Sequence, residues 1–321
     1  EDLSVWLAGV QGMCPPAPFE HPAVVIFAGD HGVARTSGTS AYPPEVTAQM
    51  VANFATGGAA ANVLARQAGA SIRVVDVSVD ADPAYLDRID PAIADRRIRR
   101  GCGSIDREDA MRPDEVDAAF DLGRTLAAEA LSAGADVLIA GDMGIGNTTP
   151  ASALIGLLTG HPASAVTGRG TGIDDPTLER KTATVAAAMR RGADSADDPR
   201  ALLRTVGSPD IAAMAGFLLE GPVLGRPVIL DGIVSCAAAL VVARMAPGAR
   251  EWWVAGHRST ERAATLALAE LGLSPVLDLE LRLGEGTGAL LALPVLASAA
   301  LTLAEMATFD GAGVSNRDAS A

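Results

Sequence analysis

Two glycine-rich segments each hold one carboxylate that could act on a bound molecule. Residues 141–150 read GDMGIGNTTP and are called here the Asp142 loop, and residues 282–289 read RLGEGTGA and are called the Glu285 loop. Glycine lets a backbone come close to a phosphate, and free N–H groups at the start of a helix favour anions. Because an apolar, helix-like run follows each loop, both loops are predicted to hold a phosphorylated ligand beside a carboxylate.

Proton transfer is the chemistry expected of these carboxylates. The glycines on either side of Glu285 have no side chains to shield it, so its carboxylate can meet a ligand directly as a general base. Asp142 has a similar setting. The alternative for both residues is a structural role, in which the carboxylate caps the helix that follows.

Other chemistry-bearing residues are scattered along the chain. The glycine-rich segment at 168–172 precedes Lys181, which can supply positive charge to a phosphate, although a lysine on a solvated helix face is the commoner outcome. Asp30 and His31 could suggest a metal ion or a proton shuttle. The chain has only 4 histidines and none lies close to His31 in the sequence, so we expect no metal site.

Known nucleotide-binding patterns fit this sequence poorly. The Asp142 loop matches neither the dinucleotide fingerprint nor a P-loop, and the Glu285 loop matches only the relaxed dinucleotide form. No acidic residue that could bind a ribose stands at a strand end about 20 residues further on. A Rossmann-like oxidoreductase is therefore the weakest of the functional interpretations.

The elements that would position these residues follow a βα pattern. Short β-branched runs alternate with Ala- and Leu-rich runs, which predicts a mostly parallel sheet flanked by helices. The predicted strands are at 23–28, 72–77, 137–140, 227–230 and 252–255. Asp30, Asp76, Asp142 and Asp231 stand at or just after strand ends, where α/β proteins bind ligands.

Helices are easier to place than strands. They are predicted at 43–54, 176–191, 211–219, 259–271 and 289–304. In the first of these, Val46, Met50 and Phe54 share one face. Thr149 is predicted as an N-cap with Pro150 as the first helical residue, which would put the glycines before them at a helix N-terminus.

Composition excludes several kinds of partner. The net charge is −14, from 25 basic and 39 acidic residues with no basic run, so nucleic acid and anionic membranes are disfavoured. The apolar stretch at 289–304 is shorter than the ~20 residues of a spanning helix and is predicted to be a buried helix. Three widely spaced cysteines and the absence of signal-peptide features in residues 1–6 lead us to expect a cytoplasmic protein.

A set of motifs occurs in the order found in one enzyme family. They are 29–33 (GDHGV), 40–43 (SAYP), 45–50 (EVTAQM), 141–149 (GDMGIGNTT), Lys181, 231–232 (DG), 257–259 (HRS) and 282–288 (RLGEGTG). From about residue 24 to residue 314 the chain resembles the nicotinate-nucleotide:dimethylbenzimidazole phosphoribosyltransferases, which make the lower-ligand nucleotide of cobalamin. The two long glycine motifs are the specific part of this resemblance.

The resemblance implies an architecture and a set of roles. It implies a Rossmann-like α/β domain at 23–290, a small helical domain from 1–22 and 291–321, and a homodimer with its sites near the subunit interface. Glu285 would be the catalytic base and Asp142 the second catalytic carboxylate. Ser40, Tyr42 and Gln49 would lie near the benzimidazole, and the ribose phosphate would be surrounded by Gly144, Ile145, Gly146, Asn147, Thr148, Lys181, Leu283, Gly284, Gly286 and Thr287.

The chain departs from the family pattern at three places. Asp142 and Asp210 stand where the family often has Glu, and the residues at 101–104 read GCGS in place of the usual Gly-Thr motif. The change at Asp142 shortens a predicted site carboxylate by one methylene. The alternative function is therefore a non-catalytic homologue that binds the base or its nucleotide.

The implied reaction suits the residues. In nicotinate mononucleotide the leaving pyridine nitrogen is already positively charged, so its departure needs no general acid. What remains is to remove the N–H proton of the benzimidazole while the opposite face of C1′ is attacked, which inverts the anomeric centre and gives the α-ribotide. No pyrophosphate leaves, so neither Mg²⁺ nor another cofactor is expected.

Overall fold

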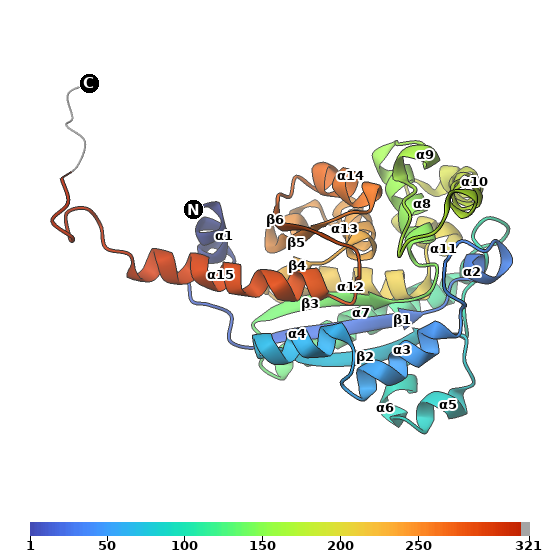
Figure 1. Cartoon of the computed structure of the whole chain (residues 1–321), viewed down its shortest axis with the longest axis horizontal. Coiled ribbons are helices and arrows are strands. Elements are labelled where there is room, and N and C mark those ends of the chain that lie inside the picture. Colours follow the sequence, from blue (N-terminus) through green and yellow to red (C-terminus); the bar gives the residue numbers. More distant parts are fainter. Residues whose placement is uncertain (316–321) are drawn as a thin grey trace.

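The strand β1 (Pro22–Gly29) is buried along its whole length because it lies inside a parallel sheet that helices cover on both faces. In this computed structural model, which describes residues 1–315, the 6 strands follow the order β2-β1-β3-β4-β5-β6 and all neighbours are parallel (Figure 1). The other strands are β2 (Ser71–Ser78), β3 (Val137–Met143), β4 (Val228–Leu230), β5 (Trp253–Ser259) and β6 (Pro275–Leu281). The predicted α/β fold is confirmed.

Helices connect the strands and form the outer layers. They are α1 (Asp2–Gln11), α2 (Gly32–Thr36), α3 (Val46–Ala55), α4 (Ala60–Ala68), α5 (Pro83–Asp87), α6 (Pro91–Ala94), α7 (Pro113–Ser132), α8 (Thr148–Thr159), α9 (Ala163–Val166), α10 (Asp175–Gly192), α11 (Pro199–Val206), α12 (Pro209–Val223), α13 (Ile233–Met245), α14 (Arg262–Leu271) and α15 (Thr287–Glu305). Short 3₁₀ turns lie at Ala193–Ser195 and Pro247–Trp252.

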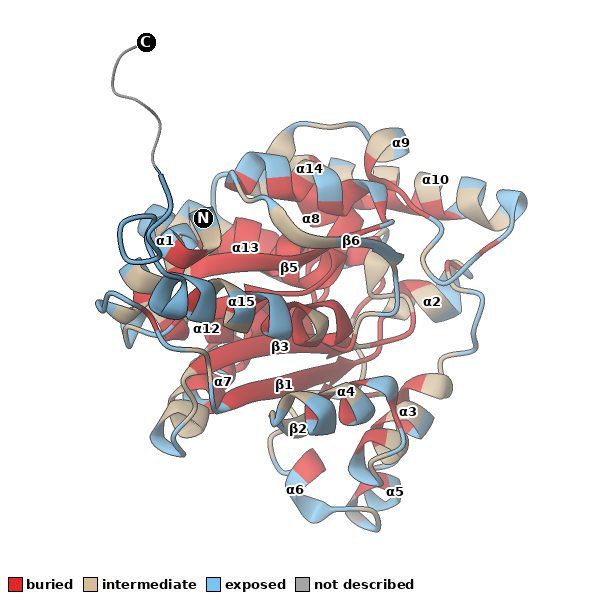
Figure 2. Ribbon diagram, turned by 60° about the vertical axis from the view of Figure 1, so that its left-hand side comes forward, coloured by how far each residue is buried: buried red, intermediate tan, exposed pale blue. Residues whose placement is uncertain are grey.

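Alternate residues of each central strand enter two different cores, as the period of a strand requires. Val25 and Phe27 face α7 and α12, where the Phe27 ring meets Phe217 edge to face with centroids 5.5 Å apart. Val24 and Ile26 face the opposite layer, formed by α15 and α4. The inner strands of the sheet are therefore buried on both sides, which Figure 2 shows as a buried centre.

The strand order places a crevice where a ligand can bind. β1 lies between β2 and β3, so the chain passes to one side of β1 first and then returns to the other side. In open α/β sheets, ligands bind beyond the carboxyl ends of the strands at such a point of reversal. The Asp142 loop begins within β3 and therefore starts at this crevice.

Several predicted boundaries are wrong, each for a local reason. β6 is a sixth strand that the sequence did not predict, because it lies at the sheet edge and its central residues, such as Leu279, are exposed. The helix predicted at 259–271 begins only at Arg262, because β5 continues to Ser259. On α3 the buried residues are Thr47, Ala48, Val51 and Phe54, while Val46 and Met50 are only half-buried.

The start of α8 also differs from the prediction. The helix begins at Thr148 with Asn147 in the N-cap position, two residues before the predicted start. Thr149 is not a cap but a buried first-turn residue whose hydroxyl has no hydrogen-bond partner within residues 1–315. The glycines of the Asp142 loop nevertheless lie directly before a helix N-terminus, as expected.

The helix α15 is buried only over its first half. Leu290, Leu293 and Leu296 pack into the core, whereas residues 301–305 are all exposed. The prediction of a buried helix is therefore wrong for residues 301–304, at the end of the helix that extends away from the sheet (Figure 1). The sequence pattern missed this because the exposed half is as apolar as the buried half.

The two chain ends meet on α15. Ser4 of α1 donates a hydrogen bond from its hydroxyl to the Ala299 carbonyl at 2.9 Å. The domain boundary predicted at 290/291 falls inside this continuous helix, and residues 316–321 of the predicted second domain lie outside the described residues. Within residues 1–315, α15 is also the one helix long and apolar enough to cross a membrane, and 44% of its apolar window is buried in the protein.

Candidate active site

Two adjoining cavities lie beyond the carboxyl ends of the strands. The larger, about 100 Å³, is called the main cavity and is lined by Asp142, Met143, Gly144, Ile145, Asn147, Thr148, Gly170, Thr171, Gly232, Ile233, Val234, His257, Ser259, Glu261, Arg282, Leu283 and Gly284. The smaller, about 50 Å³, is called the side cavity and is lined by Thr39, Ser40, Ala41, Gly144, Ile145, Gly146, Asn147, Thr148, Arg169, Gly170, Thr171, Ile173 and Lys181. The Asp142 loop forms the wall between the two.

Close backbone contacts hold the Asp142 loop in place. A side chain at Gly144 would lie 2.2 Å from the Gly29 carbonyl oxygen, so only glycine fits there. The Ile145 amide donates to the Thr47 hydroxyl at 3.0 Å, and that hydroxyl donates to the Asp30 carboxylate at 2.7 Å. The loop is therefore fixed to the end of β1 and to α3 before any ligand arrives.

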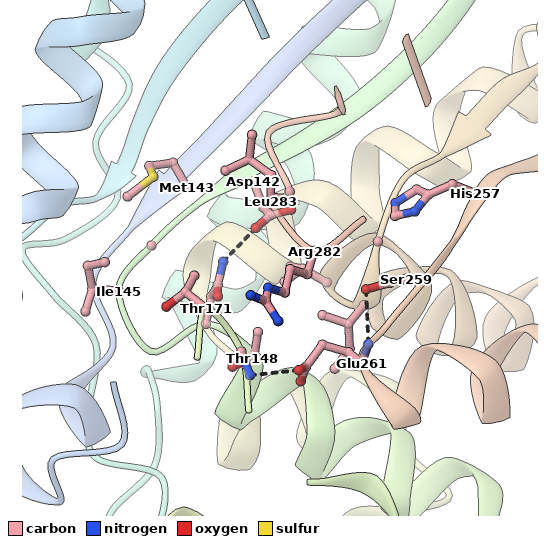
Figure 3. Close-up of a pocket in the computed structure, with 17 residues that line it drawn as sticks. Asp142, Met143, Ile145, Thr148, Thr171, His257, Ser259, Glu261, Arg282 and Leu283 are labelled. Atoms are coloured by element: carbon pink, nitrogen blue, oxygen red, sulfur yellow. Dashed lines mark hydrogen bonds between the residues drawn. The ribbon is translucent and has the colours of Figure 1, made fainter. Parts of the chain in front are cut away.

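Asp142 is a buried carboxyl in the main cavity. Its Oδ2 accepts a hydrogen bond from the Asn147 amide nitrogen at 2.7 Å (Figure 3). Burial, together with the charges of Asp231, Asp210 and Glu285, raises the pKa of Asp142 to about 8. At neutral pH most molecules therefore carry Asp142 in its neutral form.

The Glu285 loop forms a tight turn that a second carboxylate stabilises. Gly284, Glu285 and Gly286 all have positive φ angles, of 82°, 63° and 81°, and the value at Glu285 is unusual for a residue with a side chain. The buried Asp231 carboxylate accepts hydrogen bonds from the amides of Gly286 at 3.1 Å, Gly288 at 2.8 Å and Ala289 at 3.0 Å. These three hydrogen bonds to Asp231 thus offset the strain of the positive φ angle at Glu285 and fix the orientation of the turn.

The Glu285 side chain is less exposed than its glycine neighbours suggest. It is 4% exposed, because the first turn of α4 covers it, and its Oε2 accepts a hydrogen bond from the Ala61 amide at 3.3 Å. Burial raises the pKa of Glu285, and the charge of Asp231 raises it too, whereas the Ala61 amide lowers it. The expectation that nothing shields this carboxylate is wrong.

The two loops touch each other although they lie far apart in the chain. A side chain at Gly141 would lie 2.7 Å from the Glu285 carbonyl carbon, and one at Gly284 would lie 3.1 Å from Oδ2 of Asp142. Glycine at these positions lets the loops pack backbone against backbone. The structure therefore brings the two predicted catalytic residues together, but only Asp142 lines the main cavity, whereas Glu285 lines neither cavity.

Lys181 is buried, and the commoner outcome of a solvated lysine is wrong here. It is 1% exposed and lines the side cavity, where its Nζ donates to the Thr148 hydroxyl at 2.7 Å and the Gly168 carbonyl at 3.0 Å. Burial lowers the pKa of Lys181, while the nearby Glu261 carboxylate partly opposes this. A buried ammonium beside a helix N-terminus is well suited to bind a phosphate.

The remaining predicted residues divide into two groups. Those that line one or both cavities are Ser40, Gly144, Ile145, Gly146, Asn147, Thr148, Leu283 and Gly284. Tyr42, which is 51% exposed, and Gln49, which is also exposed, line neither cavity. Gly286 and Thr287 stabilise the turn instead, since the Thr287 hydroxyl donates to the Gly284 carbonyl at 2.7 Å.

Sequence reasoning missed several residues of the main cavity. Arg282 points into it (Figure 3), and it could have been found because it opens the Glu285 loop. Glu261 accepts from the Gly170 amide at 2.7 Å, while its second oxygen has no partner among the described residues. Nothing in the sequence indicated Glu261. The sequence predicted a helix from residue 259, which placed Glu261 inside that helix, whereas in the structure Glu261 lies between β5 and α14.

Among the side chains that the structure describes, no group of three His, Cys, Asp or Glu residues could bind a metal ion. The fold and the site together define an α/β protein in which two buried carboxyl groups lie near a helix N-terminus and a buried lysine. The amides before α8 and the ammonium of Lys181 are of the kind that can hold an anion, and carboxyl groups are of the kind that can transfer a proton.

Comparison with known proteins identifies the family. The profile of a family described as phosphoribosyltransferase matches residues 1–314, so the chain belongs to that family. It is 56% identical over 315 residues to the nicotinate-nucleotide–dimethylbenzimidazole phosphoribosyltransferase of Mycobacterium marinum, covering 98% of this chain and 86% of that one. It is also 56% identical over 319 residues to the enzyme of the same name from Mycobacterium avium, covering 99% and 90%.

A solved structure supports the same relationship. The fold is similar to the crystal structure of CobT from Thermus thermophilus, with a TM-score of 0.90 and 44% sequence identity, over 98% of this chain and 92% of that one. The resemblance stated from the sequence motifs is therefore confirmed, and the protein is a phosphoribosyltransferase by family and by fold.

Proposed function

We propose that this protein transfers the phosphoribosyl group of nicotinate mononucleotide to dimethylbenzimidazole or a related base, releasing nicotinate and forming the α-ribotide of the cobalamin lower ligand. The names of its relatives support this reaction. The observation that carries the proposal is the contact between the two loops, because it puts a carboxylate on a fixed turn next to an anion site.

The phosphate of nicotinate mononucleotide is assigned to the side cavity and the Asp142 loop. The amides of Gly146 and Thr148 donate no hydrogen bond within residues 1–315, which leaves them available to phosphate oxygens. Lys181 adds positive charge there, and Arg282 adds a second cation in the main cavity. This arrangement leaves the ribose between the phosphate and the Glu285 loop.

Glu285 is assigned as the general base. Its raised pKa makes the carboxylate a stronger base than an ordinary glutamate, while the bond from the Ala61 amide holds its position. It takes the N–H proton of the base as the other ring nitrogen attacks C1′. The positive charge on the nicotinate nitrogen is neutralised when its bond to C1′ breaks, so the site needs no acid for the leaving group.

Asp142 is assigned a different role from Glu285. With a pKa of about 8 it is mostly neutral at pH 7, so it is a poor base but can donate a hydrogen bond to a substrate oxygen. The shorter side chain leaves the Asn147 contact intact. The departure from the family Glu is therefore compatible with catalysis, which counts against the non-catalytic alternative.

The base-binding part is assigned to Ser40, Tyr42 and Gln49. The two cavities, of about 100 and 50 Å³, are smaller than the roughly 300 Å³ of a typical small-molecule pocket. We therefore expect the segment that holds Ser40 and Tyr42 to rearrange when a base binds.

Turnover by the purified protein tests the function. Incubation with nicotinate mononucleotide and dimethylbenzimidazole should release nicotinate and give one new nucleotide, with each quantified by chromatography and the α-anomer identified by NMR. A panel of purines and phenols in place of dimethylbenzimidazole defines the accepted base. Binding of both substrates without any release of nicotinate would support the non-catalytic alternative instead.

The assembly and location are further parts of the proposal. We infer a homodimer in which α1 and the exposed half of α15 meet a second copy, because Val5, Leu301, Leu303 and Met306 are exposed there at 71, 43, 44 and 70%. In this assignment the chain ends form the small helical unit, and the sites lie near the subunit interface. Sedimentation at micromolar concentration should give twice the chain mass of 32.5 kDa, and a monomer would reject the inference.

The three unpaired cysteines favour the cytoplasm as the location of the protein, which cell fractionation can check.

A further inference from the structure

Glu261 is a buried residue of the main cavity that has no part in the assigned reaction. It lies between β5 and α14, beyond the carboxyl end of a strand, and is 5% exposed. Its Oε1 accepts a hydrogen bond from the Gly170 amide at 2.7 Å, whereas its Oε2 has no partner within residues 1–315. Buried polar groups are almost always hydrogen-bonded, so an unpaired carboxylate oxygen at a cavity wall indicates a donor on the ligand.

Two other carboxylate oxygens are buried and unpaired within residues 1–315, but neither belongs to the site. They are Oδ1 of Asp136, directly before β3, and Oδ1 of Asp210, in the first turn of α12. Neither residue lines the main cavity or the side cavity, whereas the side chain of Glu261 points into the main cavity (Figure 3). Glu261 therefore stands apart from the other two as a group that can meet a ligand.

The glycine-rich segment at 168–172 holds the Glu261 carboxylate at the cavity wall. A side chain at Gly168 would lie 2.3 Å from Oε2 and 2.5 Å from Oε1 of Glu261, so only glycine lets the backbone pack against the carboxylate. Gly170 and Thr171 of the same segment line both cavities. The carboxylate is therefore fixed near the place where the two cavities adjoin, before any ligand binds.

The cations of the site leave Glu261 without an ion pair within residues 1–315. Lys181 donates instead to the Thr148 hydroxyl at 2.7 Å and to the Gly168 carbonyl at 3.0 Å. The Arg282 guanidinium points into the same cavity as Glu261 (Figure 3) and pairs with no carboxylate in that part of the chain. Both side chains therefore keep hydrogen-bonding capacity for a ligand.

A carboxylate selects hydrogen-bond donors and repels anions. The phosphate of nicotinate mononucleotide is assigned to the Asp142 loop and Lys181, and both the phosphate and the nicotinate carboxylate carry negative charge. The ribose hydroxyls are therefore the donors that this nucleotide offers to Glu261. In dinucleotide-binding α/β proteins, an acidic residue beyond a strand end binds a ribose hydroxyl in the same way.

We propose that Glu261 recognises the ribose of the nucleotide, with Oε2 accepting a hydrogen bond from the 2′ or the 3′ hydroxyl. The inference rests on the proposed function, because it takes a phosphoribosyl compound as the substrate. Fixing a hydroxyl on one side and the phosphate on the other orients the ring whose C1′ is attacked. A hydrogen bond to a carboxylate is stronger than one between neutral groups, so the site selects ribose over deoxyribose.

Binding of deoxy analogues tests this role. Affinities for nicotinate mononucleotide and for its 2′-deoxy and 3′-deoxy forms are measured by calorimetry without an acceptor base, so that no transfer occurs. The wild-type protein should bind at least one deoxy form about tenfold or more weakly than the parent nucleotide, since a hydrogen bond to a charged group is lost. Equal affinities for all three nucleotides would overturn the proposal.

Substitution of Glu261 should remove this selectivity. In Glu261→Met, the ratio of ribose to deoxyribose affinity should fall to about one, because the acceptor is gone. Loss of the Gly170 contact weakens the binding of all three nucleotides alike and cancels in the ratio. A Glu261→Met protein that folds and keeps the wild-type ratio would overturn the role of Glu261.

Two further variants make the comparison secure. Glu261→Gln can still accept from the Gly170 amide, and it serves if the Met variant does not fold. Its ratio should fall by about threefold or more, because a neutral amide binds a hydroxyl more weakly than a carboxylate does, and an unchanged ratio would overturn the proposal. Glu179→Met is the matched control, since it removes one negative charge from an exposed position on α10, and it should keep the wild-type ratio.

The results separate this inference from the proposed function. If the wild-type protein releases nicotinate in the presence of a base but binds the deoxy forms as tightly as the parent nucleotide, the function stands and the role of Glu261 is wrong. If it distinguishes the deoxy forms through Glu261 but releases no nicotinate with any base, the role of Glu261 stands and the transfer reaction is wrong. Failure to bind any of the three nucleotides would overturn both.

Discussion

The Asp142 loop and the Glu285 loop look alike in sequence but are built differently. Asp142 stands at the end of a strand, with its carboxyl group inside the main cavity and a hydrogen bond from the side chain of Asn147. Glu285 stands on a turn of left-handed residues, with its carboxylate held by the backbone amide of Ala61. The carboxyl group of Asp142 lines the main cavity, and that of Glu285 accepts a hydrogen bond at the N-terminus of α4.

The consequence is a difference in protonation. Several carboxylates surround Asp142, and burial among them raises its pKa to about 8. Glu285 is also buried and its pKa is raised, but the Ala61 amide stabilises the charged form and limits the rise. Two carboxyl groups in glycine-rich loops therefore suit opposite tasks, one as a hydrogen-bond donor and one as a base.

Asp231 connects the two environments. Its carboxylate accepts three backbone amides of the Glu285 loop, and its charge raises the pKa of both Glu285 and Asp142. The residue that fixes the turn thus also adjusts the proton affinity of both groups. The roles of the two loops follow from this shared partner as much as from their own residues.

Glu285→Gln should have the largest effect on turnover. The amide keeps the shape and can still accept from the Ala61 amide, but it cannot take a proton, so nicotinate release should fall by about 10²–10⁴-fold. Affinity for nicotinate mononucleotide, measured by calorimetry, should be unchanged. A folded variant that releases nicotinate at the wild-type rate would show that the base lies elsewhere, and Asp142 would be tested next.

Lys181→Met should have a smaller effect, on nucleotide binding. A hydrogen bond to a charged group contributes about 1.5–3 kcal/mol, so affinity for nicotinate mononucleotide should fall by tenfold or more while affinity for the free base stays the same. Arg180→Met is the matched control, because it removes one positive charge from an exposed position next to Lys181. Equal losses of affinity in both variants would mean that the effect is one of overall charge.

Much of the fold could be predicted from the sequence. The four inner strands and the edge strand β2 all contain buried apolar runs and were predicted, and the glycine loops follow the expected strand and precede the expected helices. β6 was missed because none of its residues is buried, and the exposed end of α15 was missed because apolar residues do not reveal whether they face a core or another molecule.

The site was predicted in its parts but not in its arrangement. Glycine spacing indicated both loops and Lys181, since local sequence reports where a backbone approaches a ligand. The burial of Lys181, the covering of Glu285 by α4 and the unpaired oxygen of Glu261 depend on contacts between distant segments of residues 1–315. A single sequence carries no local signal for such contacts.

Asp142→Asn should have the smallest effect on turnover and a characteristic effect on stability. The asparagine oxygen can accept from Asn147 as the neutral carboxyl does, so nicotinate release at pH 7 should stay within about tenfold of wild type, far above the Glu285→Gln value. A loss as large as that of Glu285→Gln would instead make Asp142 the base.

The pH dependence of unfolding provides the sharper test of the difference between the loops. The pKa of Asp142 rises from 3.8 to about 8 on folding, so between these values the folded protein holds a proton that the unfolded chain has lost. The stabilising contribution is therefore complete below pH 3.8 and is lost as the pH rises to about 8, at up to about 1.4 kcal/mol per pH unit.

Asp142→Asn cannot ionise, so its Tm should rise relative to wild type between pH 5 and pH 8. Asp194→Asn, at an exposed position, should follow the wild-type curve. Parallel curves for wild type and Asp142→Asn would mean that Asp142 is charged in the folded protein, and the two loops would then be alike in chemistry as well as in sequence.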